Sequence, residues 1–67
     1  MDIETLQLLA IYYFERIRTR CVFLKTYSYM EEEGNFAFYG LYKCKRRVVV
    51  KKVILTPDGN LVGVFSL

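Results

Sequence analysis

The hydrophobic pattern of the first twenty residues predicts an amphipathic helix. Asp2 is a suitable N-cap, and Asp2 and Glu4 lie where the positive end of a helix dipole favours acidic side chains. The spacing predicts a helix from about Asp2 to Arg20. The apolar positions that form one stripe of this helix are Ile3, Leu6, Ala10, Tyr13, Phe14, Ile17, Cys21 and Leu24.

The opposite face of this helix is also apolar over its first half, where a surface helix is normally polar. The residues are Leu8, Ile11 and Tyr12. Three interpretations fit them: deeper burial of this end, a contact surface for a second copy or another protein, or a helix lying on a membrane surface.

After the helix, the pattern becomes typical of β-strands. A strand is expected from Val22 or Thr26 to Met30, and simple alternation places Phe23, Lys25, Tyr27 and Tyr29 on one face. The acidic segment 31–35 is a hairpin loop in which Gly34 or Asn35 adopts a positive φ. A second strand, 36–43, follows. Its residues Phe36, Phe38 and Tyr42 share a face with Gly40, where another group is expected to come close.

The last third of the chain predicts a β-hairpin. The segment 46–56 is rich in β-branched residues, and Thr56-Pro57-Asp58-Gly59-Asn60 suits a type I turn with Gly59 in the left-handed region. Regular pairing from this turn places Leu55 opposite Leu61, Val53 opposite Gly63 and Lys51 opposite Phe65. On the other face, Ile54 lies opposite Val62, Lys52 opposite Val64 and Val50 opposite Ser66. Both faces of the hairpin would then be apolar.

Together these elements predict one α+β domain over residues 1–67, in which an N-terminal helix packs on a three- to four-stranded antiparallel β-meander. The alternative is a small helix-capped β-barrel. One helix cannot cover both faces of a sheet, so the sheet either closes into a barrel or packs on another molecule. We therefore expect a non-catalytic protein-interaction module, as a homodimer or docked on a larger protein. The expected interface residues are Leu8, Ile11, Tyr12, Val50, Ile54, Val62 and Val64.

The positive charge is concentrated rather than spread over the chain. The formal net charge is +3, yet the ten residues 43–52 contain six cations and no acid. Such a segment suits binding to nucleic acid, with nearby tyrosines stacking on bases. It equally suits a solvated edge strand, where Lys and Arg prevent aggregation. The residues of the nucleic-acid alternative are Lys43, Lys45, Arg46, Arg47, Lys51, Lys52, Arg16, Arg18, Arg20, Tyr27 and Tyr29.

The chain has few residues suited to catalysis or to metal binding. The chain has no histidine and two serines, and its two cysteines, Cys21 and Cys44, do not form a CxxC pair. We expect no enzymatic activity, no cofactor and no small-molecule substrate. Two reduced, buried thiols in a reducing compartment are favoured over a Cys21–Cys44 disulfide.

The start of the chain does not resemble a signal peptide, because Asp2 and Glu4 stand where a basic segment would be. The uncharged run from Thr5 to Phe14 is ten residues long, against the ~20 that span a bilayer. We therefore expect no transmembrane segment and a cytoplasmic or otherwise intracellular protein.

Overall fold

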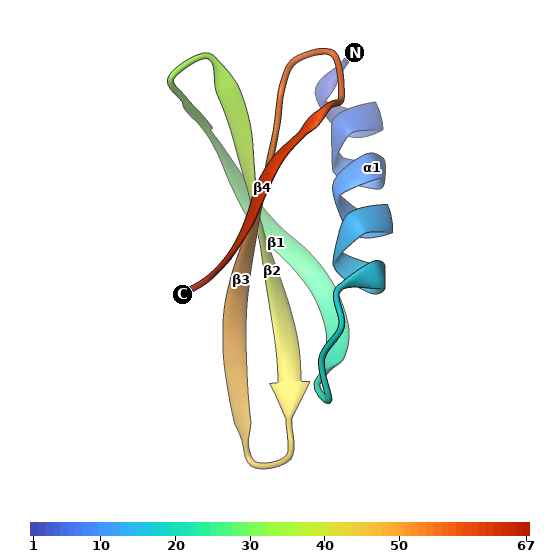
Figure 1. Ribbon diagram of the computed structural model, residues 1–67, viewed down its shortest axis with the longest axis vertical. Helices are drawn as coiled ribbons and strands as arrows, with labels where there is room; N and C mark the ends of the chain where they lie inside the picture. Colours follow the sequence, from blue (N-terminus) through green and yellow to red (C-terminus); the bar gives the residue numbers. More distant parts are fainter.

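The computed structural model describes all residues from Met1 to Leu67 as one helix and four strands. Helix α1 spans Ile3–Arg16, and the strands are β1 (Val22–Glu32), β2 (Asn35–Cys44), β3 (Arg47–Leu55) and β4 (Leu61–Ser66). The strands form an antiparallel sheet in the order β1-β2-β3-β4, and α1 lies along one face of it (Figure 1). The expected α+β meander is confirmed with four strands. The sheet is open, so the barrel alternative is wrong.

Helix α1 begins where the sequence predicts and ends earlier. The backbone N–H of Thr5 donates to Asp2 Oδ1 at 2.8 Å, and this hydrogen bond lowers the pKa of the Asp2 carboxyl. The helix ends at Arg16, and Ile17 already has an extended backbone, so the expected end at Arg20 is wrong. Residues 17–21 instead form the connection that brings the chain to the start of β1. With 14 residues, α1 is too short to cross a membrane.

The core lies between α1 and the facing side of the sheet. Leu6, Ala10 and Phe14 of the predicted helical stripe are buried. They pack against four buried side chains of β2 and β3, namely Phe38, Tyr42, Val53 and Leu55. The Tyr42 hydroxyl donates a hydrogen bond to the carbonyl oxygen of Phe14, so the one polar atom of this cluster is satisfied.

Strands β1 and β2 form a hairpin with a tighter turn than expected. Glu33 and Gly34 occupy the turn with φ values of 52° and 82°, and Asn35 already belongs to β2. Two register irregularities in β1 interrupt the alternation of side chains. The expectation that Phe23, Lys25, Tyr27 and Tyr29 share one face is right for Phe23 and Tyr29, which lie opposite Tyr42 and Phe38, and wrong for Lys25 and Tyr27. Phe23 stacks on Phe14 in the core, whereas Tyr27 contacts Tyr39 on the other face of the sheet.

The turn between β3 and β4 is as predicted, but the strand register beyond it is not. Gly59 has φ 88° and donates its N–H to the carbonyl oxygen of Thr56 at 2.9 Å, and Leu55 lies opposite Leu61. An irregularity in the strand pairing follows at Val62. Beyond it, Gly63 lies opposite Ile54 and Val64 opposite Val53. Phe65 then lies opposite Lys52, and Ser66 opposite Lys51. Because β4 carries one extra residue at this β-bulge, the pairs predicted beyond it are displaced by one.

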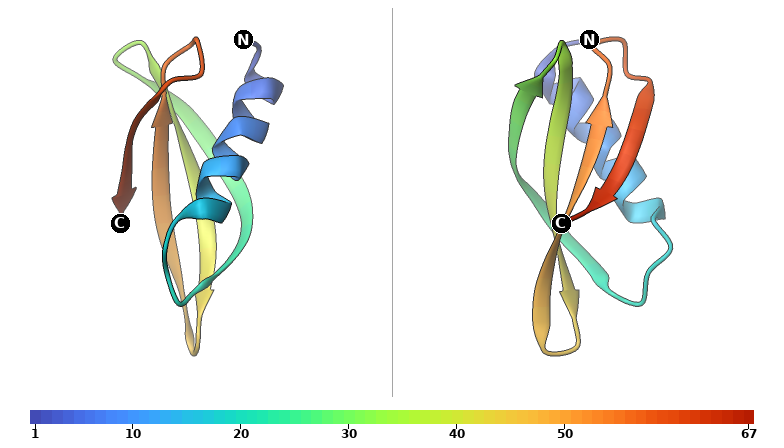
Figure 2. Two further views of the ribbon diagram at one scale, coloured as in Figure 1. Left: turned by 45° about the vertical axis from the view of Figure 1, so that its right-hand side comes forward. Right: turned by 60° about the vertical axis from the view of Figure 1, so that its left-hand side comes forward.

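Strand β4 lies outside the part of the sheet that the helix covers. Helix α1 contacts β1, β2 and β3 but not β4. Strand β4 is an edge strand that pairs with Lys51–Leu55 of β3, while the β2–β3 hairpin projects beyond it (Figure 2). The molecule is accordingly elongated, with extents of 35 × 19 × 18 Å.

Candidate functional site

The structure places the seven expected interface residues in three separate regions. Leu8, Ile11 and Tyr12 lie on the helix. Val50 and Ile54 lie on the outer face of the sheet, which is the face turned away from α1, because they alternate with the buried Val53. Val62 and Val64 lie on the edge strand β4. Val64 shares the face of Val53, so the expectation that it lies beside Val50 and Ile54 is wrong.

Part of the group on the helix (Leu8, Ile11 and Tyr12) is covered by other side chains of the same helix. The Arg16 guanidinium lies 3.5 Å above the centre of the Tyr12 ring, and the edge of this ring meets Tyr13. Ile11 is half-buried. Leu8 is therefore the one side chain of this group that is both strongly exposed and without such a contact. A single exposed leucine does not make a docking surface.

The outer face of the sheet carries a polar network between its apolar side chains. Tyr39 donates its hydroxyl to Glu32 Oε2 at 3.1 Å, and Lys52 Nζ lies 3.6 Å from Glu32 Oε1. Burial and the Glu32 carboxylate raise the pKa of the Tyr39 hydroxyl. This network crosses β1, β2 and β3, and it interrupts the apolar surface on which Val50 and Ile54 lie. The side chains of Val50 and Ile54 are half-buried.

Strand β4 is an edge without the usual protection. The segment 61–67 contains no charged residue and no proline. Its apolar side chains are exposed by 41% to 67%, namely Leu61, Val62, Val64, Phe65 and Leu67. Proteins normally protect a sheet edge with charges, prolines or bulges that disturb pairing. The outer side of β4 has only the bulge near its beginning.

The opposite edge of the sheet, strand β1, carries charged residues that β4 lacks. Strand β1 carries Lys25, Glu31 and Glu32, and two register irregularities interrupt it in its first half. Charges and bulges of this kind discourage another chain from adding to the sheet. Both edges have bulges, so the two edges differ in charge: β1 carries charged residues and β4 carries none.

The hydrogen-bond pattern shows which backbone groups of β4 face outward. Leu67 donates its N–H to the carbonyl oxygen of Val50 at 3.0 Å, so this N–H points into the sheet. In an antiparallel pair the N–H groups of alternate residues point to opposite sides. The N–H groups of Val64 and Ser66 therefore point to the free edge.

The residues of the nucleic-acid alternative fall into several groups. Lys51 donates to Ser66 Oγ at 2.8 Å, Lys52 pairs with Glu32, and Arg16 is held over Tyr12. Tyr27 and Tyr29 pack against Tyr39 and Phe38, further along β1 than the cationic turn. The structure therefore does not bring the tyrosines together with the cations. Lys43, Lys45, Arg46 and Arg47 do lie together at the tip of the β2–β3 hairpin, while Arg18 and Arg20 lie in the connection before β1.

The two cysteines form a disulfide, so the expectation of reduced thiols is wrong. Cys21 and Cys44 are bonded, with their Cα atoms 4.4 Å apart. The sequence alone gave no sign of this proximity, because it depends on the early end of α1 and on Val22 pairing with Lys43. Disulfides are typical of oxidising compartments. The cysteines therefore give no support to a reducing compartment, and the intracellular location stays a prediction.

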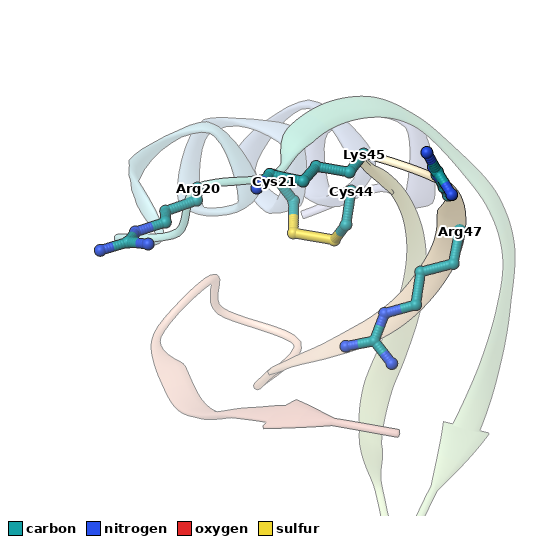
Figure 3. A pocket seen from close by; sticks show the side chains of 6 residues that line it. Arg20, Cys21, Cys44, Lys45 and Arg47 are labelled. Atoms are coloured by element: carbon teal, nitrogen blue, oxygen red, sulfur yellow. A yellow bond between two sulfur atoms is a disulfide. The ribbon is translucent and has the colours of Figure 1, made fainter.

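A pocket of about 450 Å³ surrounds this disulfide. Its lining residues are Arg20, Cys21, Cys44, Lys45, Arg46 and Arg47. Figure 3 shows Lys45 extending toward Cys21 and the Arg47 guanidinium turned toward the side of the disulfide, while Arg20 points outward. A second hollow of about 250 Å³ lies between α1 and β1, where Gln7 donates to the Thr26 hydroxyl at 3.2 Å.

Comparisons with known proteins add no information on function. No protein-family model matches the chain, and neither a curated protein nor a solved structure is significantly similar to it. No group of three or more His, Cys, Asp or Glu side chains is placed to hold a metal ion.

Proposed function

We propose that this protein is a non-catalytic interaction module that works as a homodimer, in which β4 of one protomer pairs with β4 of its partner. The observation that carries the proposal is the unprotected edge of β4. Two such strands related by a two-fold axis would join two four-stranded sheets into one of eight strands. The partner is a second copy because the edge is self-complementary: it has no charge that repels its equivalent.

Two physical effects favour this association. The outward N–H groups of Val64 and Ser66, with the carbonyl groups beside them, would gain hydrogen-bond partners along the new strand pair. The neighbouring strand would also cover part of the exposed apolar side chains of β4, at about 25 cal/mol per Å² of apolar surface removed from water. A contact along a strand of six residues is small for a protein interface. We therefore expect a dissociation constant on the order of micromolar.

The test is sedimentation equilibrium of the wild type and of Val64→Lys over a range of concentrations. We expect the wild type to form a dimer and Val64→Lys to remain a folded monomer, because the two added positive charges would lie close together along the paired edge. Ser28→Lys is the matched control: it adds the same charge to an exposed position on the other edge strand, and it should leave the dimer intact.

A monomeric wild type at the highest concentration would refute the proposal. A Val64→Lys variant as dimeric as the wild type would also refute it, since the association would then use another surface. Circular dichroism of each variant confirms that the comparison is between folded proteins.

A further inference from the structure

The cations that line the pocket at the disulfide have no partners within the protein. Arg20, Lys45, Arg46 and Arg47 are exposed, and their side chains take part in no ion pair and no hydrogen bond. A guanidinium carries five N–H donors and an ammonium three. Four cationic groups around one pocket thus present many unused donors and four positive charges.

The acidic residues of the sheet lie at the other end of the same strand. Glu31, Glu32 and Glu33 are at the β1–β2 turn, and β2 runs its whole length from there to Cys44. No carboxylate lines the pocket. The potential at the hairpin tip is therefore positive, without a nearby acid to reduce it.

The disulfide forms part of this site. It joins the end of β2 to the connection before β1, and so holds Arg20 beside the Lys45–Arg46 turn. Its two sulfur atoms give the pocket an apolar part between the charged side chains (Figure 3). The turn itself is short, because Cys44 pairs with Arg47 and leaves only two residues between the strands.

We propose that this pocket binds a phosphate- or sulfate-bearing anion, and that the disulfide holds its cations in place. Guanidinium groups bind tetrahedral oxyanions through paired N–H donors, and neighbouring cations add electrostatic attraction. At about 450 Å³, the pocket has room for more than one phosphate group. This site is independent of the β4 edge and does not rest on the proposed dimer.

The test is calorimetric titration of the oxidised protein with inorganic pyrophosphate, and in a second experiment with a short single-stranded oligothymidylate. We expect binding that weakens as sodium chloride is added, because the attraction is electrostatic. Arg47→Gln should weaken it about tenfold, the loss expected for one charged hydrogen-bonding group. Lys25→Gln is the control, since it removes the same charge from β1 outside the pocket and should leave the affinity unchanged.

The double variant Cys21→Ser/Cys44→Ser tests the role of the disulfide. We expect it to bind pyrophosphate more weakly than the wild type while Lys25→Gln does not. If this double variant fails to fold, Arg47→Gln retains the disulfide and still tests the site.

The outcomes test separately the source of the phosphate groups, the binding site itself and the role of the disulfide. Binding of pyrophosphate points to a ligand whose phosphate groups are recognised directly, and binding of the oligonucleotide alone points to a nucleic-acid backbone as the source of the phosphates. Binding of neither ligand would overturn the site. Equal weakening by Arg47→Gln and Lys25→Gln would overturn it too, because the attraction would then come from the net charge alone. A folded double variant that binds as tightly as the wild type would overturn the role of the disulfide.

Discussion

Gly40 determines how closely α1 approaches the sheet. A Cβ atom at this position would lie 2.9 Å from two atoms of the Phe14 ring, and this ring is fully buried. The sequence predicts that something comes close to Gly40, because a glycine in the middle of a strand is unfavourable without a reason. It does not say that the close group is the ring of Phe14, since that depends on the position of the helix along β2.

We predict that Gly40→Ala lowers the free energy of unfolding by about 1 to 3 kcal/mol, the cost of overpacking a core. Gly63→Ala is a matched control, because its Cβ would also meet a phenyl ring, that of Phe65, at 2.9 Å. The Phe65 ring is 46% exposed and lies at the sheet edge rather than in the core, so it can yield and the change should stay within about 0.5 kcal/mol. Urea denaturation measures both. Equal effects of the two substitutions would contradict this account of the core.

Tyr42 is the buried residue whose ionisation should affect stability. Burial raises the pKa of its hydroxyl from 10.0 to about 12. The folded protein therefore holds this proton more tightly than the unfolded chain does. The stability contributed by the buried hydroxyl is complete below pH 10 and is lost as the pH rises toward 12.

We predict that the melting temperature of the wild type falls between pH 10 and pH 12, and that it falls less steeply in Tyr42→Phe. The phenylalanine variant should be less stable at neutral pH, because it loses the hydrogen bond to the Phe14 carbonyl group. Thermal melts over this range measure both effects. Identical pH dependence in the two proteins would show that another group controls the alkaline transition.

At the scale of elements, the β1–β2 turn contains a residue with a strained backbone that the sequence does not indicate. Glu33 has φ 52°, a left-handed conformation that side chains other than Asn, Asp and Gly seldom adopt. The acidic run 31–33 marks a turn, and Gly34 marks a positive φ, but nothing in the sequence indicates that the turn starts at Glu33 rather than at Gly34. A turn of two residues with both φ values positive is the type that asparagine followed by glycine favours.

We predict that Glu33→Asn raises the free energy of unfolding by about 0.5 to 1 kcal/mol, because asparagine tolerates the left-handed region. For a domain of this size the gain corresponds to a few degrees in melting temperature, roughly 4 to 8 °C per kcal/mol. Glu33→Gln is the control, since it removes the same charge without that backbone preference. A gain of equal size in Glu33→Gln would assign the effect to repulsion within the acidic run.

The order and type of the elements follow from the sequence, whereas their ends and register do not follow in full. The 3.6-residue stripe and the turn at Pro57-Asp58-Gly59 are local signals, and the structure contains both. The end of α1 at Arg16 and the bulge in β4 depend on how distant segments meet. For that reason the predicted pairing is right at Leu55 and Leu61 and wrong beyond them.

At the scale of the whole molecule, the sequence predicts an excess of apolar surface but not its position. The chain is 54% hydrophobic, yet 9 of its 67 residues are buried. An open sheet with one helix leaves apolar residues on the helix, on the outer face and on β4 alike. The structure distinguishes these surfaces, because Arg16 covers Tyr12 and the network of Glu32, Tyr39 and Lys52 divides the outer face. On β4, Lys52 lies over the Phe65 ring and Lys51 bonds Ser66, but the strand itself carries no charged residue.

The candidate anion site could be predicted only in part. The run of cations in 43–52 is visible in the sequence, but Lys51 and Lys52 lie on opposite faces of the sheet and take part in internal contacts. Arg20 joins the site because the disulfide brings two distant segments together. A pairing between residues 23 positions apart is not encoded in any local pattern.

The most direct test of the proposed dimer is amide hydrogen exchange at Val64 and Ser66, measured at low and at high protein concentration. Their N–H groups point to the free edge of β4, so in a monomer they exchange rapidly with solvent. If β4 pairs with β4 of a second copy, their exchange slows as the protein concentration rises, while that of Leu67, which is bonded within the sheet, changes little. Rapid exchange of both groups at every concentration would contradict the pairing of β4 with its copy.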